Sequence, residues 1–337
     1  MLGLLAVLGL AAMLATMRAP VAAQAKTPVK ISVLRSAFVY FAPYMAEGRG
    51  IFAKHGLDAK LVYLSSGAET TMAIVSGSVE FGAVATEHVV QVRDQGMKLK
   101  AIVANLQDSP YTLIVRKEVN LPSAAKGYPD VIRDLKGLKL GMTGRGASTD
   151  FTLRFLCKEA GLDPDRDVTL IATGGVTTTL AALQKGDIQG FLAFEPIQSQ
   201  AIHGFGIAKP VIDIRRGEGP KLLRDYAYNS MAAREDYIAA NPETVRRMVE
   251  AIVETHHFLA DPKNFEEALR VAEKYFEGID PKLLRTMLAD GIKAYRPVIS
   301  RQAMANIGEM LLFAGLIKKA PVYEDTVDVR YVPTKFP

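Results

Sequence analysis

The stretch that decides the fold occurs twice, as GSVEFGAVAT at residues 77–86 and as GDIQGFLAFE at residues 186–195. The two copies align without a gap, so that Thr86 lies opposite Glu195. Short apolar runs that follow a glycine are typical of buried β-strands. We therefore interpret the pair as the same strand in two copies of one structural unit.

The sequence around this strand repeats as well. GLD at residues 56–58 matches GLD at residues 161–163, and each ends a predicted helix. The first copy begins at Lys30 and the second at Leu138, and both read strand, helix, strand, helix, strand. Strands that alternate with helices are also the general pattern of α/β proteins, which is the alternative to a true duplication. About 90 residues are thus present twice.

Strand–helix–strand units form parallel sheets that are covered on both faces and bind ligands at the carboxyl ends of their strands. Two units predict two lobes with facing loops. The competing architecture is one fused sheet, as in dinucleotide-binding folds. The first strand–helix turn, SAFVYFAP at 36–43, lacks the G-x-G-x-x-G pattern. The second, TGRGAST at 143–149, spaces its glycines differently.

After Tyr237 the pattern is purely helical. Asn241 and Pro242 are typical of a helix start, as N-cap and first residue. We predict helices at about 242–259, 265–276, 281–295 and 301–315, which return to brace the first lobe.

The equivalent strands YTLIVRKE and YNSMAARED, at 111–118 and 228–236, mark two crossings of a hinge near 109–111 and 226–230. The predicted domain organisation is a signal peptide at 1–25, a discontinuous lobe 1 at 26–110 and 231–337, and lobe 2 at 111–230.

The amino terminus indicates export. Residues 1–25 combine an apolar run with the small-residue segment AQA at 23–25, a pattern typical of a secretory signal that is cleaved before Lys26. The run is short for a membrane span, although an uncleaved anchor is the alternative. The chain of 337 residues has a formal net charge of +5 that is dispersed along it. This mild excess of positive charge favours an anionic ligand. It does not form the dense cluster of Lys and Arg that nucleic-acid binding needs.

Catalytic and metal-binding patterns are weak. Cys157 is the single cysteine and falls within a helix pattern, where a small core residue is the simplest interpretation. His256 and His257 are adjacent on a predicted helix and point about 100° apart, so they cannot share one metal ion. We expect no metal, no cofactor and no enzymatic activity.

Four segments together resemble a known family. They are FAPYMAEGRGIFAKHGLDAKLVYLSSGAETTMAIVSGSVEFGAVAT at 41–86, DLKGLKLGMTGRGASTDFTLRFLCKEAGLD at 134–163, ALQKGDIQGFLAFEP at 182–196 and NPETVRRMVEAI at 241–252. The chain resembles the nitrate/sulfonate/taurine class of ABC-transporter substrate-binding proteins, a group that also contains binders of thiamine pyrimidine precursors. The resemblance implies a type II periplasmic binding protein fold, in which each lobe is a mostly parallel sheet flanked by helices.

The predicted ligand site lies between the lobes, at loops that follow the strands. The first lobe offers hydroxyl and aromatic groups at Ser36, Phe38, Tyr40, Ser65, Ser66, Gly67 and Thr86. The second lobe offers Arg145, Gly146, Ser148, Thr173, Gly174 and Glu195. Free backbone N–H groups at helix N-termini after Ser66 and Gly174 would suit an anionic group.

Several of these residues have a structural alternative. Ser65, Ser66 and Ser148 are also ordinary helix caps, and Arg145 is either a bidentate partner of a carboxylate or a solvated loop residue. Glu195 is either a ligand acceptor or one partner of a salt bridge between lobes. As an acceptor it would select a ligand with an N–H group and repel a bare anion.

The sequence thus predicts a monomeric solute-binding protein that closes on a small organic ligand, a sulfonate, an aromatic carboxylate or a heterocycle. Its expected partners are that ligand and the membrane permease and ATPase of an ABC transporter. A pyrimidine-precursor synthase-like enzyme and a ligand-sensing module are the alternatives.

Overall fold

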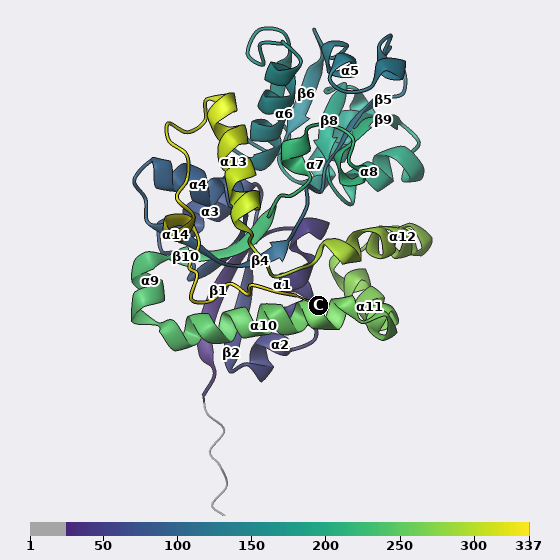
Figure 1. Cartoon of the computed structure of the whole chain (residues 1–337). Coiled ribbons are helices and arrows are strands. Elements are labelled where there is room, and N and C mark those ends of the chain that lie inside the picture. The colour runs from purple at the N-terminus through teal and green to yellow at the C-terminus, as the bar shows by residue number, and fades with distance from the viewer. Residues whose placement is uncertain (1–24, 337) are drawn as a thin grey trace, which may run out of the picture.

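The computed structural model describes residues 25–336 and places them in two lobes, one above the other (Figure 1). The expected signal peptide therefore lies outside the described residues, except for Ala25 at its end. Among the described helices, none combines the length and the hydropathy that a membrane crossing needs.

Each lobe contains one five-stranded sheet. The first sheet has the order β2-β1-β3-β10-β4 and consists of β1 (Thr27–Leu34), β2 (Leu57–Leu64), β3 (Phe81–Ala85), β4 (Leu99–Leu106) and β10 (Asn229–Arg234). The second has the order β7-β6-β8-β5-β9 and consists of β5 (Thr112–Arg116), β6 (Lys139–Met142), β7 (Thr169–Ala172), β8 (Gly190–Ala193) and β9 (Ala208–Asp213). The two orders are the same once each strand is replaced by its repeat equivalent, which confirms the predicted two-lobed α/β fold.

The lobes exchange one strand. β5 follows β4 in the chain yet pairs antiparallel with β8 and β9 in the second sheet. β10 follows β9 yet pairs antiparallel with β3 and β4 in the first sheet. The pairing of β10 begins at Asn229, opposite Ala85. We therefore propose that lobe 1 resumes at Asn229, slightly before the division between 230 and 231 that we expected from the sequence.

The helices cover both sheets. Those around the first sheet are α1 (Phe41–Gly48), α2 (Ile51–Lys54), α3 (Gly67–Val75), α4 (Thr86–Asp94) and α9 (Glu235–Ala240), followed by α10 (Pro242–Ala260), α11 (Phe265–Tyr275), α12 (Pro281–Gly291), α13 (Arg301–Ala314) and α14 (Tyr323–Thr326). Those around the second sheet are α5 (Asp130–Arg133), α6 (Ser148–Glu159), α7 (Val176–Lys185) and α8 (Ile197–Ser199). Their inward faces are apolar, and one cluster of buried side chains runs through both lobes.

The carboxy-terminal helices pack against the first lobe, and one of them, α13, also contacts the second lobe. Along α10, Lys54 donates to Glu254 at 2.8 Å, as expected for a brace of that lobe. α13 lies between α4 of the first lobe and α6 of the second (Figure 1). Lys158 of α6 donates to the carbonyl of Ala314 at 2.6 Å, and the rings of Phe155 and Phe313 lie 5.6 Å apart. This helix therefore contacts both lobes.

The start of α10 differs from the prediction in one detail. Pro242 is the first residue of the helix, as expected, but the side chain of Asn241 accepts no capping hydrogen bond. Its Nδ2 instead donates to the carbonyl of Tyr237 at 3.1 Å. The same carbonyl also accepts from the backbone N–H of Asn241 at 2.9 Å, so both groups of Asn241 bind the end of α9, and its side chain does not cap the start of α10.

Candidate functional site

The two lobes enclose a small cavity at the ends of their strands. Its volume is about 20 Å³, which is room for about one water molecule. Strand ends, helix starts and hinge residues line it: Leu34, Val39, Tyr40, Gly67, Ala85, His88, Tyr111, Thr143, Ala147, Ser148, Thr149, Phe194 and Tyr228. We call this space the enclosed cavity. It lies where the repeat predicted a site, at loops that follow strands of both lobes.

The first lobe contributes the start of α3 and one ring from α4. Ser66 is the N-cap of α3, and its Oγ accepts from the backbone N–H of Glu69 at 3.2 Å. The Glu69 carboxylate accepts in turn from the N–H of Ser65, the residue before the N-cap, at 3.0 Å, so two backbone N–H groups at this helix start are satisfied by side chains. Gly67 follows, and a Cβ there would lie 2.8 Å from Cε1 of His88. The glycine thus lets the His88 ring pack against the helix start.

The second lobe contributes the loop that leads from β6 into α6. Gly146 has a φ of +71°, a conformation that favours glycine, and its N–H donates to Asp150 Oδ2 at 2.9 Å. The hydroxyl of Thr149 accepts from the N–H of Thr143 at 3.0 Å. Ser148, at the first position of α6, is 5% exposed, and its hydroxyl interacts with the buried carboxyl of Glu87.

Contacts across the cleft show that the lobes are closed. His88 Nε2 lies 3.1 Å from the carbonyl oxygen of Gly146. A Cβ on Gly144 would lie 3.3 Å from Cβ of Ser66, so the two loops nearly touch. The N–H of Phe38 donates to the carbonyl of Glu195 at 3.0 Å. Each lobe therefore contacts the other through groups on both sides of the enclosed cavity.

Aromatic side chains form the remaining walls. Tyr111 and Tyr228 come from the two hinge crossings, and their hydroxyls lie 2.8 Å apart. Burial raises the pKa of both tyrosines well above the ordinary value, so both stay neutral. Tyr40 and Phe194 line the same space. Flat walls of this kind suit a planar ligand.

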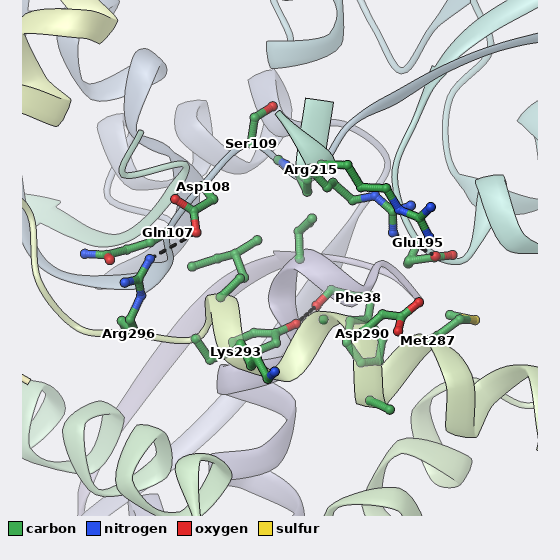
Figure 2. Close-up of a pocket in the computed structure, with 18 residues that line it drawn as sticks. Phe38, Gln107, Asp108, Ser109, Glu195, Arg215, Met287, Asp290, Lys293 and Arg296 are labelled. Atoms are coloured by element: carbon green, nitrogen blue, oxygen red, sulfur yellow. Dashed lines mark hydrogen bonds and ion pairs between the residues drawn. The ribbon is translucent and has the colours of Figure 1, made fainter. Parts of the chain in front are cut away.

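A larger and more open pocket of about 550 Å³ lies beside the hinge. Figure 2 shows Arg215 and Glu195 of the second lobe on one side of it and Asp290 at the end of α12 on the other. Farther along, Arg296 donates to Asp108 at 3.0 Å. Its volume is typical of a pocket for an organic molecule, and two ion pairs, Arg215 with Glu195 and Arg296 with Asp108, lie in its wall.

Glu195 is held by its own lobe. Its Oε1 accepts from Gln198 Nε2 at 2.6 Å and from Ser199 Oγ at 2.8 Å, and Arg215 lies 3.5 Å away. Burial raises the pKa of Glu195, while the hydrogen bonds from Gln198 and Ser199 and the charge of Arg215 lower it. The side chain makes no salt bridge between lobes within the described residues, because Arg215 follows β9 in the same lobe. Its backbone carbonyl, which accepts from the N–H of Phe38, is the group that contacts the first lobe.

The structure brings together only some of the predicted site residues. Tyr40, Gly67 and Ser148 line the enclosed cavity, and Ser66 and Gly146 lie directly behind it. Phe38 and Glu195 line the larger pocket, and Ser36 lines a third one of about 290 Å³ with α7.

The remaining predicted residues have other surroundings. Ser65 and Arg145 are exposed. Thr86 is fully buried, and its Oγ1 lies 2.6 Å from the hydroxyl of Ser230. Thr173 Oγ1 donates to the carbonyl of Met142 at 3.1 Å, and Gly174 has a φ of +76° in the adjacent turn.

Sequence reasoning missed the most unusual group at the site. Glu87 and His88 follow the strand β3 directly, as the first residues of α4, and are 0% and 2% exposed. Glu87 Oε1 accepts from the hydroxyl of Tyr226 at 2.6 Å. Burial raises the pKa of Glu87 to about 7, against hydrogen bonding from Ser148 and Tyr226. The signal was present in the sequence, since two ionisable residues directly after a buried strand are uncommon.

Metal ligands do not gather in the described part of the chain. Between residues 25 and 336, no group of three or more His, Cys, Asp or Glu side chains is arranged to hold a metal ion.

Known proteins with similar sequences include binders and an enzyme. The nitrate/nitrite binding protein NrtA of Nostoc sp. is 26% identical over 248 residues, which cover 69% of this chain and 54% of the relative. This chain thus spans about half the length of that protein. The 4-amino-5-hydroxymethyl-2-methylpyrimidine phosphate synthase of Aspergillus parasiticus is 27% identical over 237 residues, 68% of this chain and 66% of the relative.

A solved structure supports the fold. The alkanesulfonate-binding protein SsuA from Xanthomonas axonopodis pv. citri, bound to MOPS, superposes with a TM-score of 0.72 at 16% identity and covers 89% of this chain and 98% of that one. The sequence model of the NMT1-like family matches residues 22–273, more than half of the chain. This protein therefore belongs to the NMT1-like family and has the fold of periplasmic solute-binding proteins.

Proposed function

We propose that this protein is the extracytoplasmic solute-binding component of an ABC importer and that it binds a small organic solute between its lobes. One observation carries the proposal. The starts of α3 and α6 meet from opposite lobes at a cavity where a buried polar atom, Nδ1 of His88, lacks a hydrogen-bond partner. Buried polar atoms are normally satisfied, so such a cavity is suited to a polar ligand. The nitrate-binding and alkanesulfonate-binding relatives support the same role.

Hinge bending is the proposed mechanism. The chain passes between lobes only at 107–111 and 214–228, so the lobes can rotate about these two connections. A ligand that contacts both lobes at once stabilises a closed form relative to an open one. The enclosed cavity holds about 20 Å³, so an organic ligand must enter an open form, and the side chains around the cavity must make room for it as the lobes close.

The ligand is proposed to be a sulfonate, an aromatic carboxylate or a heterocycle. Two helix N-termini favour an acceptor or anionic group by about 0.3–1 kcal/mol each, and more when buried. The aromatic walls formed by Tyr40, Tyr111, Phe194 and Tyr228 favour a planar group.

The proposed partners follow from this role. The closed pair of lobes would present one joined surface to a permease, which an ATPase drives. We propose a monomer located in the periplasm after removal of residues 1–25, with no nucleic-acid partner.

The synthase relative makes an enzyme the second candidate, since it is 27% identical to this chain. The one thiol is poorly suited to catalysis. Cys157 is fully buried in α6, and burial raises the pKa of its thiol to about 12. A nucleophilic cysteine needs the thiolate and an accessible position. Turnover of a pyrimidine precursor that disappears in the Cys157→Ala variant would favour the enzyme.

Thermal-shift screening combined with X-ray scattering tests the proposal. Sulfonates, aromatic carboxylates and heterocycles are added in turn to the exported protein. A ligand at 100 times its Kd raises native stability by about 2.7 kcal/mol, and it should also change the radius of gyration as the lobes move. The proposal is wrong if no class of compound changes either quantity.

A further inference from the structure

The hydrogen bond of His88 fixes which of its ring nitrogens carries the proton. Nε2 lies 3.1 Å from the carbonyl oxygen of Gly146, and a carbonyl oxygen only accepts. The proton therefore resides on Nε2, and in a neutral ring Nδ1 is left as an acceptor. Burial lowers the pKa of His88 to about 4, so the ring is neutral at physiological pH. Lobe 2 thus sets the tautomer of a histidine in lobe 1.

The acceptor nitrogen of His88, Nδ1, receives no hydrogen bond in the described structure. The residue is only 2% exposed. An unpaired buried acceptor costs about 1–3 kcal/mol. The ring lines the enclosed cavity, and its Cε1 atom lies nearest to the start of α3 at Gly67. A donor on a ligand in this space would remove that cost.

The cavity provides no counter-charge for an anion. Its lining, within the part of the chain that the structure describes, includes neither lysine nor arginine. Arg145 is in the neighbouring loop but is exposed. The nearest ionisable group behind the wall is acidic, because Glu87 precedes His88 and is fully buried. Burial of an unpaired charge is strongly unfavourable, and helix N-termini offset only about 2 kcal/mol of it in partly buried sites.

The wall formed by lobe 2, at the start of α6, requires a different group on the ligand. At the start of α6, the N–H groups of Ser148 and Thr149 have no helical acceptors, and the Ser148 hydroxyl, which also interacts with the Glu87 carboxyl, lies beside them. A hydroxyl and free N–H groups are donors. The ligand therefore needs an acceptor toward α6 of lobe 2 and a donor toward α4 of lobe 1.

We propose that the enclosed cavity selects a small uncharged solute that carries an N–H donor, such as a carboxamide or a sulfonamide, and that His88 imposes this choice. The proposal rests on the proposed function, since it names the ligand class of the same site. It departs from the relatives named for nitrate and alkanesulfonate, both of which are anions.

Matched pairs of compounds test the choice. Calorimetric titration compares methanesulfonamide with methanesulfonate and benzamide with benzoate, because each pair keeps its shape and changes charge and donor. The wild-type protein should bind the amide of each pair at least tenfold more tightly, since sites built for a hydrogen bond reject analogues that leave a polar group unpaired. His88→Leu removes the acceptor and should bring the ratio toward one.

Two further variants make the test independent of folding defects. His88→Gln keeps a side-chain acceptor and should retain part of the preference. His256→Leu is the control, because His256 is also fully buried, with Nε2 2.9 Å from the carbonyl of Asn105 and an unpaired Nδ1. It belongs to α10 and lies outside the lining of the enclosed cavity, so its loss should leave the ratio unchanged.

The outcomes separate the two proposals. Equal or tighter binding of the anions by wild-type protein overturns the selection but leaves the solute-binding role in place. A tenfold preference that survives in both His88 variants overturns the role of that residue. Failure of the wild-type protein to bind either member of both pairs overturns the selection, and the solute-binding role falls with it only if the wider screen with scattering also shows no response.

Discussion

The ends of the equivalent strands β3 and β8 carry different side chains with different partners. In the first lobe, Thr86 is fully buried against Ser230, and the next two residues, Glu87 and His88, contact the second lobe. In the second lobe, Glu195 takes the position of Thr86, and its carboxylate is bound by Gln198 and Ser199 of its own lobe.

This difference shows that an equivalent position in a repeat keeps its backbone place and not its chemical role. One lobe supplies an unpaired acceptor, and the other supplies donors at the start of α6. A ligand that satisfies both must contact both lobes, which is the condition for ligand-driven closure. The following variants test this difference between the two lobes.

The largest expected effect is on stability at high pH, in Glu87→Gln. The folded-state pKa of Glu87 is raised from 4.5 to about 7, so its stabilising contribution is full below pH 4.5 and is lost as the pH rises to 7. Glutamine does not ionise and should escape this loss. We expect the variant to be more stable by roughly 3 kcal/mol at pH 8 and equal at pH 4.

Urea denaturation across this pH range measures the difference. The ionisable neighbours of Glu87 are Tyr111, Tyr226, Tyr228 and His88. The tyrosines stay neutral. The titration of His88 is common to the wild-type protein and the Glu87→Gln variant. The matched control, Glu195→Gln, should show a smaller pH dependence, because several groups already hydrogen-bond that carboxylate. A difference between wild type and Glu87→Gln that does not change with pH would contradict the assignment.

Next in size is Gly67→Ala, which places a Cβ 2.8 Å from His88 Cε1. The ring must move away from Gly146 and from the cavity. We expect a loss of about 1–3 kcal/mol in stability, as for overpacking, and weaker ligand binding by calorimetry. Gly175→Ala is the control at the start of α7, because a Cβ there meets no atom within 4 Å. Equal behaviour of the two variants would show that His88 does not need this glycine.

A smaller effect separates the caps of the equivalent helices α3 and α7. Ser66 caps α3 with its side chain, whereas the N-cap of α7 is Gly175, which has none. Ser66→Ala should lower the free energy of unfolding by about 1 kcal/mol, and Gly175→Ser should raise it by a few tenths. Thermal unfolding of both variants checks the signs. If both substitutions shift the unfolding temperature equally, the N-cap side chain contributes little to the stability of these two helices.

The smallest effect is expected for Arg145→Ala. Arg145 is exposed in the loop before α6, and exposed substitutions usually stay within about 0.5 kcal/mol. Stability and ligand affinity should both match wild type. A tenfold loss of affinity for carboxylates or sulfonates alone would instead identify Arg145 as an anion partner and argue against an uncharged ligand.

The sequence predicted the fold better than the site. Glycine-bounded apolar runs such as 77–86 and 186–195 are local signals, and each strand formed where its pattern indicated. Site residues depend on contacts between distant segments. His88 meets Gly146 of the other lobe, and Glu195 meets Arg215, and neither pairing leaves a spacing in the chain that periodicity can reveal.

By itself, the sequence determined that this chain contains a duplicated α/β unit, two lobes and a carboxy-terminal set of helices, because strand and helix patterns arise from side chains that are neighbours along the chain. Only the tertiary structure decided which polar groups are left unpaired between the lobes. Glu195 is bound within its lobe, while His88 is neutral, hydrogen-bonded to Gly146 and part of the lining of the enclosed cavity. Burial and partners set the charge and hydrogen-bonding capacity of such groups, and both are properties of the packed lobes.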